Sequence, residues 1–181
     1  FQPSDGFINR FSQTLPIYSD DSSIENSFTS AIYQSIDDNL ILSAKFYLQT
    51  INSLDDNVRV SKRVFVPGNR LRGFEVGKIG PKDGVQYIGG NYASSLNLGS
   101  TIPNILFENE DIDLNFFLDL ANVWEVDYNS ELDSNKLRSS VGLAVNWFSA
   151  IGPLTFSYAL PLSEANTDTT ERFRFQIGTS F

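Results

Sequence analysis

The ionisable residues of this sequence favour ion pairs over catalysis. There is no His and no Cys, so a Ser-His-Asp triad, a Cys-His pair and an ordinary zinc site are excluded. Asp113 and Asp119 share one face of a predicted strand, but they lie about 20 Å apart at roughly 3.3 Å per residue. A catalytic carboxylate pair needs a separation of about 5 to 10 Å. We therefore expect no enzyme activity, no cofactor and no metal site.

The basic residues concentrate in one long segment, from about residue 52 to 87. The whole chain has a formal net charge of −9, yet this segment contains Arg59, Lys62, Arg63, Arg70, Arg72, Lys78 and Lys82. Connections longer than about 15 residues are uncommon unless they are functional or disordered, and this one is too apolar to be disordered. We interpret it as a loop that folds back onto an acidic surface, for which Asp113 and Asp119 are candidates.

The elements that must hold these residues are β-strands, because large apolar residues recur at every second position. In residues 154–160 the even positions are apolar and the odd positions are small or polar. This alternation recurs in eight segments, residues 6–18, 23–35, 40–48, 88–100, 111–123, 137–147, 154–160 and 171–181. The sequence predicts an all-β, antiparallel fold of about eight strands in a single domain over residues 1–181.

The alternation and the loop lengths indicate a transmembrane β-barrel. A barrel strand crosses a membrane with about 9 to 11 alternating residues, and such barrels have short turns at one rim and longer loops at the other. Here residues 36–39 and 149–153 are short turns, whereas 52–87, 125–135 and 163–170 are longer. The face opposite the apolar residues holds Ser, Gly, Ala, Thr and Asn as often as charged residues, which suits a crowded polar lumen. A soluble β-sandwich or lipocalin-like barrel is the alternative, since it alternates in the same way.

The acidic character of the chain argues against nucleic-acid binding, because phosphate contacts need a clustered basic surface. We expect no nucleic-acid partner. The acidic loops 125–133 and 163–171 are interpreted as solvated loop tips and not as cation sites. The chain begins at Phe1 and contains no Met, so we expect it to be an excised piece of a longer protein.

Several short motifs follow one another in a specific order between residues 64 and 181. They are Arg72-Gly73-Phe74, Ile79-Gly80-Pro81, Gly89-Gly90-Asn91, Phe116-Phe117-Leu118-Asp119, Val123-Trp124, Gly152-Pro153-Leu154, Phe156-Ser157-Tyr158 and the terminal Phe175-Gln176-Ile177-Gly178-Thr179-Ser180-Phe181. This order resembles the sixth extracellular loop and the following strands of the BamA family of outer-membrane protein assembly factors, in the surface-antigen/BamA–TamA superfamily. Residues 1–60 resemble the family in pattern only. The resemblance implies the last eight strands of a sixteen-stranded barrel, without periplasmic POTRA domains.

The resemblance also implies a site inside the barrel. In the family, the arginine of the loop motif, here Leu71-Arg72-Gly73-Phe74, reaches into the lumen and pairs with acidic residues of the inner wall. Asp119 matches one of these partners. Asn97 stands where the family carries a glutamate, so this position supplies an amide in place of a charge.

Two further expectations concern the neighbours of this arginine. Gly73 lets the backbone turn tightly beside the guanidinium, because glycine has no Cβ. Phe74 is expected to pack against Phe117 or Tyr47 on the inner wall.

The function that the resemblance implies is the folding and insertion of other outer-membrane proteins. The implied partners are client outer-membrane proteins, outer-membrane lipid or lipopolysaccharide, and assembly lipoproteins that bind through the missing POTRA domains. The implied location is the bacterial outer membrane, with both termini periplasmic. A related translocator, such as TamA or a two-partner secretion transporter, and a stand-alone eight-stranded anchor or adhesin are alternatives.

The last predicted strand, residues 171–181, would supply the edge on which client strands add by β-augmentation. Phe173, Phe175, Ile177 and Phe181 form its apolar face, and Gly178 weakens packing there, as Gly does within strands. Phe181 resembles the terminal aromatic by which the assembly machinery recognises barrel strands. We expect the isolated chain to close on itself, joining strand 6–18 to strand 171–181, because open edges in lipid leave backbone groups unsatisfied.

Overall fold

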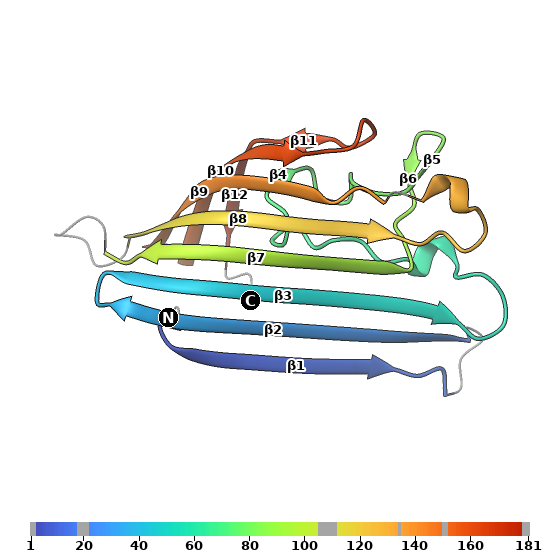
Figure 1. Ribbon diagram of the computed structural model, residues 1–181, viewed down its shortest axis with the longest axis horizontal. Helices are drawn as coiled ribbons and strands as arrows, with labels where there is room; N and C mark the ends of the chain where they lie inside the picture. Colours follow the sequence, from blue (N-terminus) through green and yellow to red (C-terminus); the bar gives the residue numbers. More distant parts are fainter. Residues whose placement is uncertain (1–2, 18–21, 105–111, 134, 150–151, 179–181) are drawn as a thin grey trace.

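The fold is one antiparallel β-sheet of eight strands, as the sequence predicts (Figure 1). The computed structural model describes residues 3–17, 22–104, 112–133, 135–149 and 152–178. The strands of the sheet follow in the order β1 (Gly6–Thr14), β2 (Ser23–Asp37), β3 (Leu40–Ser53), β7 (Tyr92–Ile102), β8 (Ile112–Trp124), β9 (Arg138–Ser149), β10 (Gly152–Ser163) and β12 (Phe173–Ile177). Across the part of the chain that the structure describes, no helix is long and apolar enough to span a membrane.

The two faces of the sheet differ in polarity. The outer face carries exposed apolar side chains, including Phe116, Leu143 and Phe173, which are 48%, 42% and 59% exposed. The inner face carries polar side chains that are fully buried, including Asp119 and Ser140. A soluble β-protein buries its apolar face instead, whereas an apolar exterior around a polar interior is typical of a membrane barrel. The alternative of a soluble sandwich or lipocalin-like barrel is therefore wrong.

The long loop joins β3 to β7 and packs on the inner side of the sheet. It contains the 3-10 helix η1 (Val60–Lys62) and the short strands β4 (Gly73–Phe74), β5 (Lys82–Asp83) and β6 (Gln86–Tyr87). β5 and β6 form a hairpin, and β4 pairs with β11 (Thr170–Glu171) in the connection between β10 and β12. Apolar residues of the loop and of the wall form one buried cluster, which comprises Tyr47, Ile51, Val58, Val64, Val66, Leu71, Phe74, Ile79, Ala93, Ala121 and Val123. The loop is thus an ordered element with its own share of the core.

Short and long connections separate to the two ends of the sheet. A turn at residues 38–39 joins β2 to β3, and β1 begins at the same end (Figure 1). β12 finishes there as well, since Ile177 pairs with Leu154 near the start of β10. The long loop, the 3-10 helix η2 (Ser130–Leu132) and the β10–β12 connection lie at the opposite end (Figure 1). The described strands therefore start and finish at the short-turn rim, as predicted.

The expected closure into an eight-stranded barrel is wrong. β1 and β12 are the two edges of the sheet, and no ladder joins them among the described residues. β9, β10 and β12 curl over the inner side, while β1 to β3 stay extended at the other edge (Figure 1). The diameter of a barrel grows with its strand number, and the curvature of these eight strands leaves their two edges unpaired. The chain forms a curved wall with two open edges.

The last strand is shorter than predicted. β12 covers Phe173–Ile177, whereas the preceding residues Thr170 and Glu171 form β11 and pair with β4. Gly178 follows the strand with a φ of +102°, a conformation that glycine adopts readily. Its N–H still donates to the backbone oxygen of Pro153 in β10 at 2.8 Å, so the expected weakening of packing at Gly178 stays a prediction. Phe181 lies outside the described residues, so its role stays a prediction.

Replacing Gly142 with Ala is expected to destabilise the inner wall. A Cβ there would lie 2.2 Å from the backbone oxygen of Tyr158 and 2.5 Å from Cζ of Phe117, and such overpacking costs about 1–3 kcal/mol. Gly99→Ala is the matched control on the same face, because its Cβ would meet the hydroxyl of Ser43, which can rotate away. The measurement is the temperature at which the folded protein loses its heat-resistant gel band. Equal losses in the two variants would contradict this packing.

Candidate functional site

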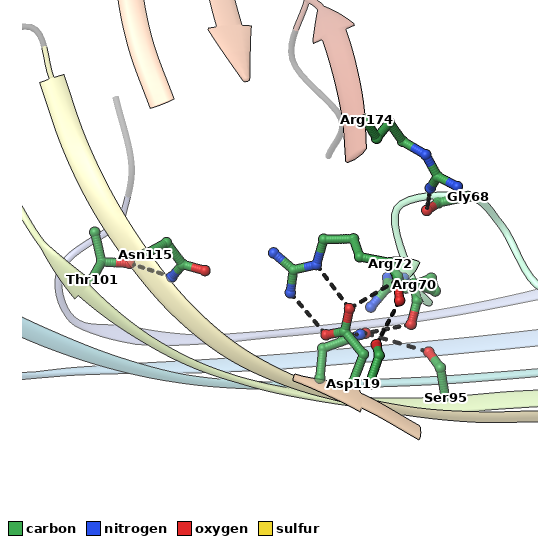
Figure 2. A network of polar contacts seen from close by, with 10 residues as sticks. Gly68, Arg70, Arg72, Ser95, Thr101, Asn115, Asp119 and Arg174 are labelled. Carbon is green, nitrogen blue, oxygen red and sulfur yellow. Dashed lines mark hydrogen bonds and ion pairs between the residues drawn. The ribbon is translucent and has the colours of Figure 1, made fainter. Parts of the chain in front are cut away.

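A carboxylate buried in the inner wall holds the long loop. Asp119 projects from β8 and is fully buried, and its two oxygens accept hydrogen bonds from Nε and Nη2 of Arg72, each at 2.8 Å (Figure 2). The backbone N–H of Arg72 donates a third bond to Asp119 at 3.1 Å. Bidentate, charge-assisted pairs of this kind are among the strongest polar contacts between side chains. The predicted contact between Arg72 and Asp119 is confirmed.

The amide of Asn97 completes the shell around this carboxylate. Asn97 lies opposite Asp119 in the β7–β8 ladder, and its Nδ2 donates to Asp119 Oδ1 at 2.9 Å and to the backbone oxygen of Arg70 at 2.7 Å. One amide thus binds both the carboxylate and the loop backbone. We call Arg72, Asp119 and Asn97 the loop clamp.

The guanidinium of Arg72 also stacks on an aromatic ring. Its central carbon lies 3.3 Å from the centre of the Phe117 ring, which is buried in the wall. The ring shields one face of the guanidinium, and the cation–π contact adds to stability. Of the two wall residues expected beside Phe74, Phe117 belongs to a separate buried cluster. Phe74 is buried instead in the cluster that contains Tyr47, the other wall residue proposed for it.

The loop backbone lies close to the wall at Gly73. Its φ is +90°, and a Cβ there would lie 3.2 Å from Cβ of Ala159 and 3.3 Å from Cβ of Ser140. The hydroxyl of Ser140 donates to the backbone oxygen of Arg72 at 2.5 Å. Leu71, on the other side of the arginine, is buried in the loop core. The glycine turn and the leucine anchor together aim the arginine at the wall, so the expected turn at Gly73 is confirmed.

A second arginine ties the base of the loop to the β8–β9 connection. Arg63 is buried, forms an ion pair with Asp127 and donates to the backbone oxygen of Val58 at 3.4 Å. Asp127 also accepts from the N–H of Val58 at 2.6 Å and from Nδ2 of Asn91 at 3.2 Å. The pKa of the Asp127 carboxyl is lowered: partial burial acts to raise it, but the hydrogen bonds from Val58 and Asn91 and the charge of Arg63 outweigh that effect.

A third ion pair joins two loops at the same rim. Arg138, at the start of β9, is fully buried and holds both oxygens of Asp168 at 2.9 Å. Asp168 also accepts from the backbone N–H of Ala165 at 2.7 Å and from that of Gly80 at 3.4 Å. Gly80 belongs to the long loop, so this carboxylate links β9, the β10–β12 connection and the loop.

These two contacts correct the interpretation of the acidic loops. Asp127 and Asp168 come from the predicted loop tips 125–133 and 163–171, and their carboxylates bind buried arginines instead of facing only water. The residues that neighbour an aspartate in an acidic loop do not predict which arginine it will bind. The excess of arginine in the long loop was a usable signal for Asp127, but Arg138 lies outside that loop.

The predicted edge residues that the structure describes share the outer face of β12. Phe173, Phe175 and Ile177 face outward and are exposed. Arg174, between them, is buried on the inner side, and its guanidinium contacts the long loop at Gly68 (Figure 2). The alternation along the strand places Arg174 inward. Its partner Gly68 lies 106 residues earlier in the chain, so the alternation could not identify it.

These features define a class of protein, the membrane β-barrel whose long loop is held against the inner wall by an arginine clamp. Comparison with known families gives the same class, since residues 1–181 match the Omp85 superfamily domain. The chain belongs to the Omp85 superfamily. Membership confirms the predicted resemblance and the transmembrane barrel fold, and it places the chain in the outer membrane.

The similar proteins are outer-membrane assembly factors. The chain is 32% identical over 139 residues to outer membrane protein assembly factor BamA of Neisseria meningitidis serogroup B, covering 61% of this chain and 17% of that protein. It is 33% identical over 128 residues to BamA of Neorickettsia risticii, covering 68% of this chain and 17% of that protein. The crystal structure of BamA from Haemophilus ducreyi lacking POTRA domains 1–3 matches with a TM-score of 0.85 and 28% identity, over 96% of this chain and 38% of that one. The chain thus spans 17% of the length of both curated relatives.

Arg72→Ala and Asp119→Asn are expected to be coupled in a double-mutant cycle. Because Asp119 is fully buried and both contacts are charge-assisted, we expect a coupling of about 1–2 kcal/mol in the stability of the folded protein. Heat stability of the folded form is the measurement, and Arg172→Ala, a change of an exposed arginine, is the control. Additivity within about 0.5 kcal/mol would show that the two side chains do not stabilise each other.

Asp127 is expected to make stability depend on pH in acid. Its folded-state pKa lies below the ordinary value of 3.8, so its contribution is fully present above that value and is lost as the pH falls through the lowered one. Heat stability of the wild type should therefore fall more steeply in acid than that of Asp127→Asn. Asp56→Asn, at an exposed carboxylate of the long loop, should follow the wild type. Parallel profiles for the wild type and Asp127→Asn would refute the expectation.

Proposed function

We propose that this protein folds and inserts β-barrel proteins into the outer membrane. The observation that carries the proposal is the loop motif, residues 71–74, seated on the inner wall by the loop clamp in a chain of the Omp85 superfamily. The relatives that share this family are named outer membrane protein assembly factors. A loop fixed in this way leaves the edge strands of the wall as the elements that can receive a client.

The proposed work is physical and needs no covalent step. β12 is an edge strand of five residues, and one side of its backbone has no ladder partner among the described residues. Unsatisfied backbone groups in lipid cost several kcal/mol each, and a client strand that adds to the edge would satisfy them. Phe173, Phe175 and Ile177 face outward, so an added strand with the same alternation would continue the apolar exterior.

The partners follow from this mechanism. Client outer-membrane proteins would meet the edge of β12, and outer-membrane lipid or lipopolysaccharide would cover the apolar face. Assembly lipoproteins would act through POTRA domains. The short-turn rim, where the described strands start and finish, would face the periplasm.

A related translocator is the second candidate. TamA or a two-partner secretion transporter would use the same kind of wall and loop, and membership of the superfamily favours this class next. A stand-alone eight-stranded anchor or adhesin is disfavoured, because β1 and β12 do not pair among the described residues.

Depletion of the gene product that carries this chain, in its own cell, tests the proposal. Assembly activity predicts that several unrelated outer-membrane barrel proteins lose their folded, heat-resistant form and that the wild-type gene restores them. Arg72→Ala should restore them incompletely, because the loop loses its charge-assisted bonds to the wall, whereas Arg172→Ala, at an exposed position, should restore them fully. Loss of one secreted protein with normal barrel assembly would identify a translocator instead. Normal assembly and normal secretion would overturn both candidates.

A further inference from the structure

The edge strand of the sheet carries an arginine that binds the long loop. Arg174 points inward from β12 and is buried. Its guanidinium donates to the backbone oxygens of Gly68 and Phe74, which lie on either side of the loop arginine. Glu171 accepts from the same guanidinium at 2.8 and 3.0 Å and balances its charge. Figure 2 shows Arg174 reaching from the strand to Gly68, across the inner side from the loop clamp.

Backbone hydrogen bonds reinforce this connection. β11, which directly precedes β12, pairs with β4 of the loop motif. The N–H of Glu75 donates to the backbone oxygen of Thr169 at 2.9 Å, and the N–H of Thr169 donates to that of Lys78 at 3.0 Å. The loop motif is therefore fixed on one side to β8 by the loop clamp and on the other side to the edge strand.

The attachment of β12 to the wall itself is small by comparison. β12 has five residues, whereas its neighbour β10 has twelve, and β12 has no second strand beside it among the described residues. A short edge strand with few ladder bonds opens at low free energy. Two further backbone hydrogen bonds extend the ladder, from Ala159 N–H to the oxygen of Arg172 and from Gly178 N–H to that of Pro153, each at 2.8 Å. The contacts from the loop add to this short ladder in holding β12.

Arginine suits this position because of its shape. A planar guanidinium carries donors that point in several fixed directions, so one side chain can bind two carbonyl oxygens and a carboxylate at once, which an ammonium group does poorly. When the loop leaves, both carbonyls are withdrawn and the guanidinium loses two of its three acceptors. The charge-assisted bonds that tie β12 to the loop are then lost, so the ladder with β10 alone would hold the strand.

We propose that Arg174 is a latch that couples the seating of the long loop to the position of the edge strand. With the loop on the wall, β12 lies against β10; with the loop displaced, β12 loosens and its edge becomes available. Coupling between two sites is reciprocal, so displacement of β12 also weakens the hold on the loop. The use of this latch rests on the proposed function, in which that edge receives client strands.

Hydrogen exchange of the complete gene product, reconstituted in phosphatidylethanolamine–phosphatidylglycerol vesicles, tests the latch. Arg174→Gln should speed exchange of the β10–β12 ladder amides and also of the Glu75 and Thr169 amides, by about tenfold or more, because bonds to a charged group are lost. Exchange in the β2–β3 ladder should not change. Arg172→Gln removes the same charge at an exposed position nearby and should leave all three regions unchanged. Faster exchange in β12 alone, or an equal response to Arg172→Gln, would overturn the latch.

The reciprocal measurement starts from the loop. Arg72→Ala breaks the loop clamp without touching β12, and it should speed exchange in the β10–β12 ladder while Arg174 is intact. Arg174→Lys keeps the positive charge but loses the planar group with several donors. Its exchange rates in the β10–β12 ladder should therefore lie between those of the wild type and Arg174→Gln. If Arg174→Gln does not fold, Arg72→Ala and Arg174→Lys test the latch in its place. Unchanged exchange of the β12 amides in both variants would overturn the latch.

The exchange measurements contain no client protein, so they separate the two proposals. Coupled exchange in a protein whose depletion leaves barrel assembly normal would refute the proposed function and leave the latch standing. Uncoupled exchange in a protein that assembles barrels would refute the latch and leave the function standing.

Discussion

A charged carboxylate inside a protein wall needs partners, and this requirement organises the long loop. Removing a carboxylate from water costs several kcal/mol unless an opposite charge and hydrogen bonds replace the water. Asp119 is fully buried in β8, and Asn97 beside it supplies an amide but no positive charge. The positive charge comes from Arg72, on the loop. The wall strand is therefore fully satisfied only when the loop is seated, so the loop belongs to the folded wall and is not an appendage.

The same solution recurs wherever the loop meets the rest of the chain. Among the described residues, further ion pairs join Arg63 to Asp127, Arg138 to Asp168 and Arg174 to Glu171. Each pair also takes hydrogen bonds to or from the backbone of the loop or of a neighbouring connection. The buried apolar cluster holds one part of the loop, but these pairs lie where the wall is polar, and the chain has no Cys for cross-links. Charge-assisted bonds of fixed geometry then supply the attachment, and they explain why an acidic chain keeps its arginines close together.

The attachment is uneven across the wall. The loop bonds to residues of β7, β8 and β9 and to Arg174 of β12, whereas β1 at the other edge is exposed along its whole length. The two edges of the sheet are thus physically different: the loop constrains β12, while β1 is held by β2. In the proposed function, movement of the loop would therefore affect the β12 edge directly. The β1 edge would not be affected directly, because the loop does not bond to it in the described structure.

The sequence by itself determined the strands and their faces, because alternation is a local property that each segment carries independently of the others. It also determined that residues 52–87 form an ordered, inward-folding loop, and the motif around Arg72 identified Asp119 as its partner. The tertiary structure alone decided the partners of Arg63, Arg138 and Arg174, which lie 64, 30 and 106 residues away in the chain. Such pairs depend on how loops from different strands meet at one rim, and no local pattern encodes that meeting. Closure was also decided in three dimensions, because it depends on the curvature of the whole sheet, which leaves β1 and β12 unpaired among the described residues, and residue periodicity carries no information about that curvature.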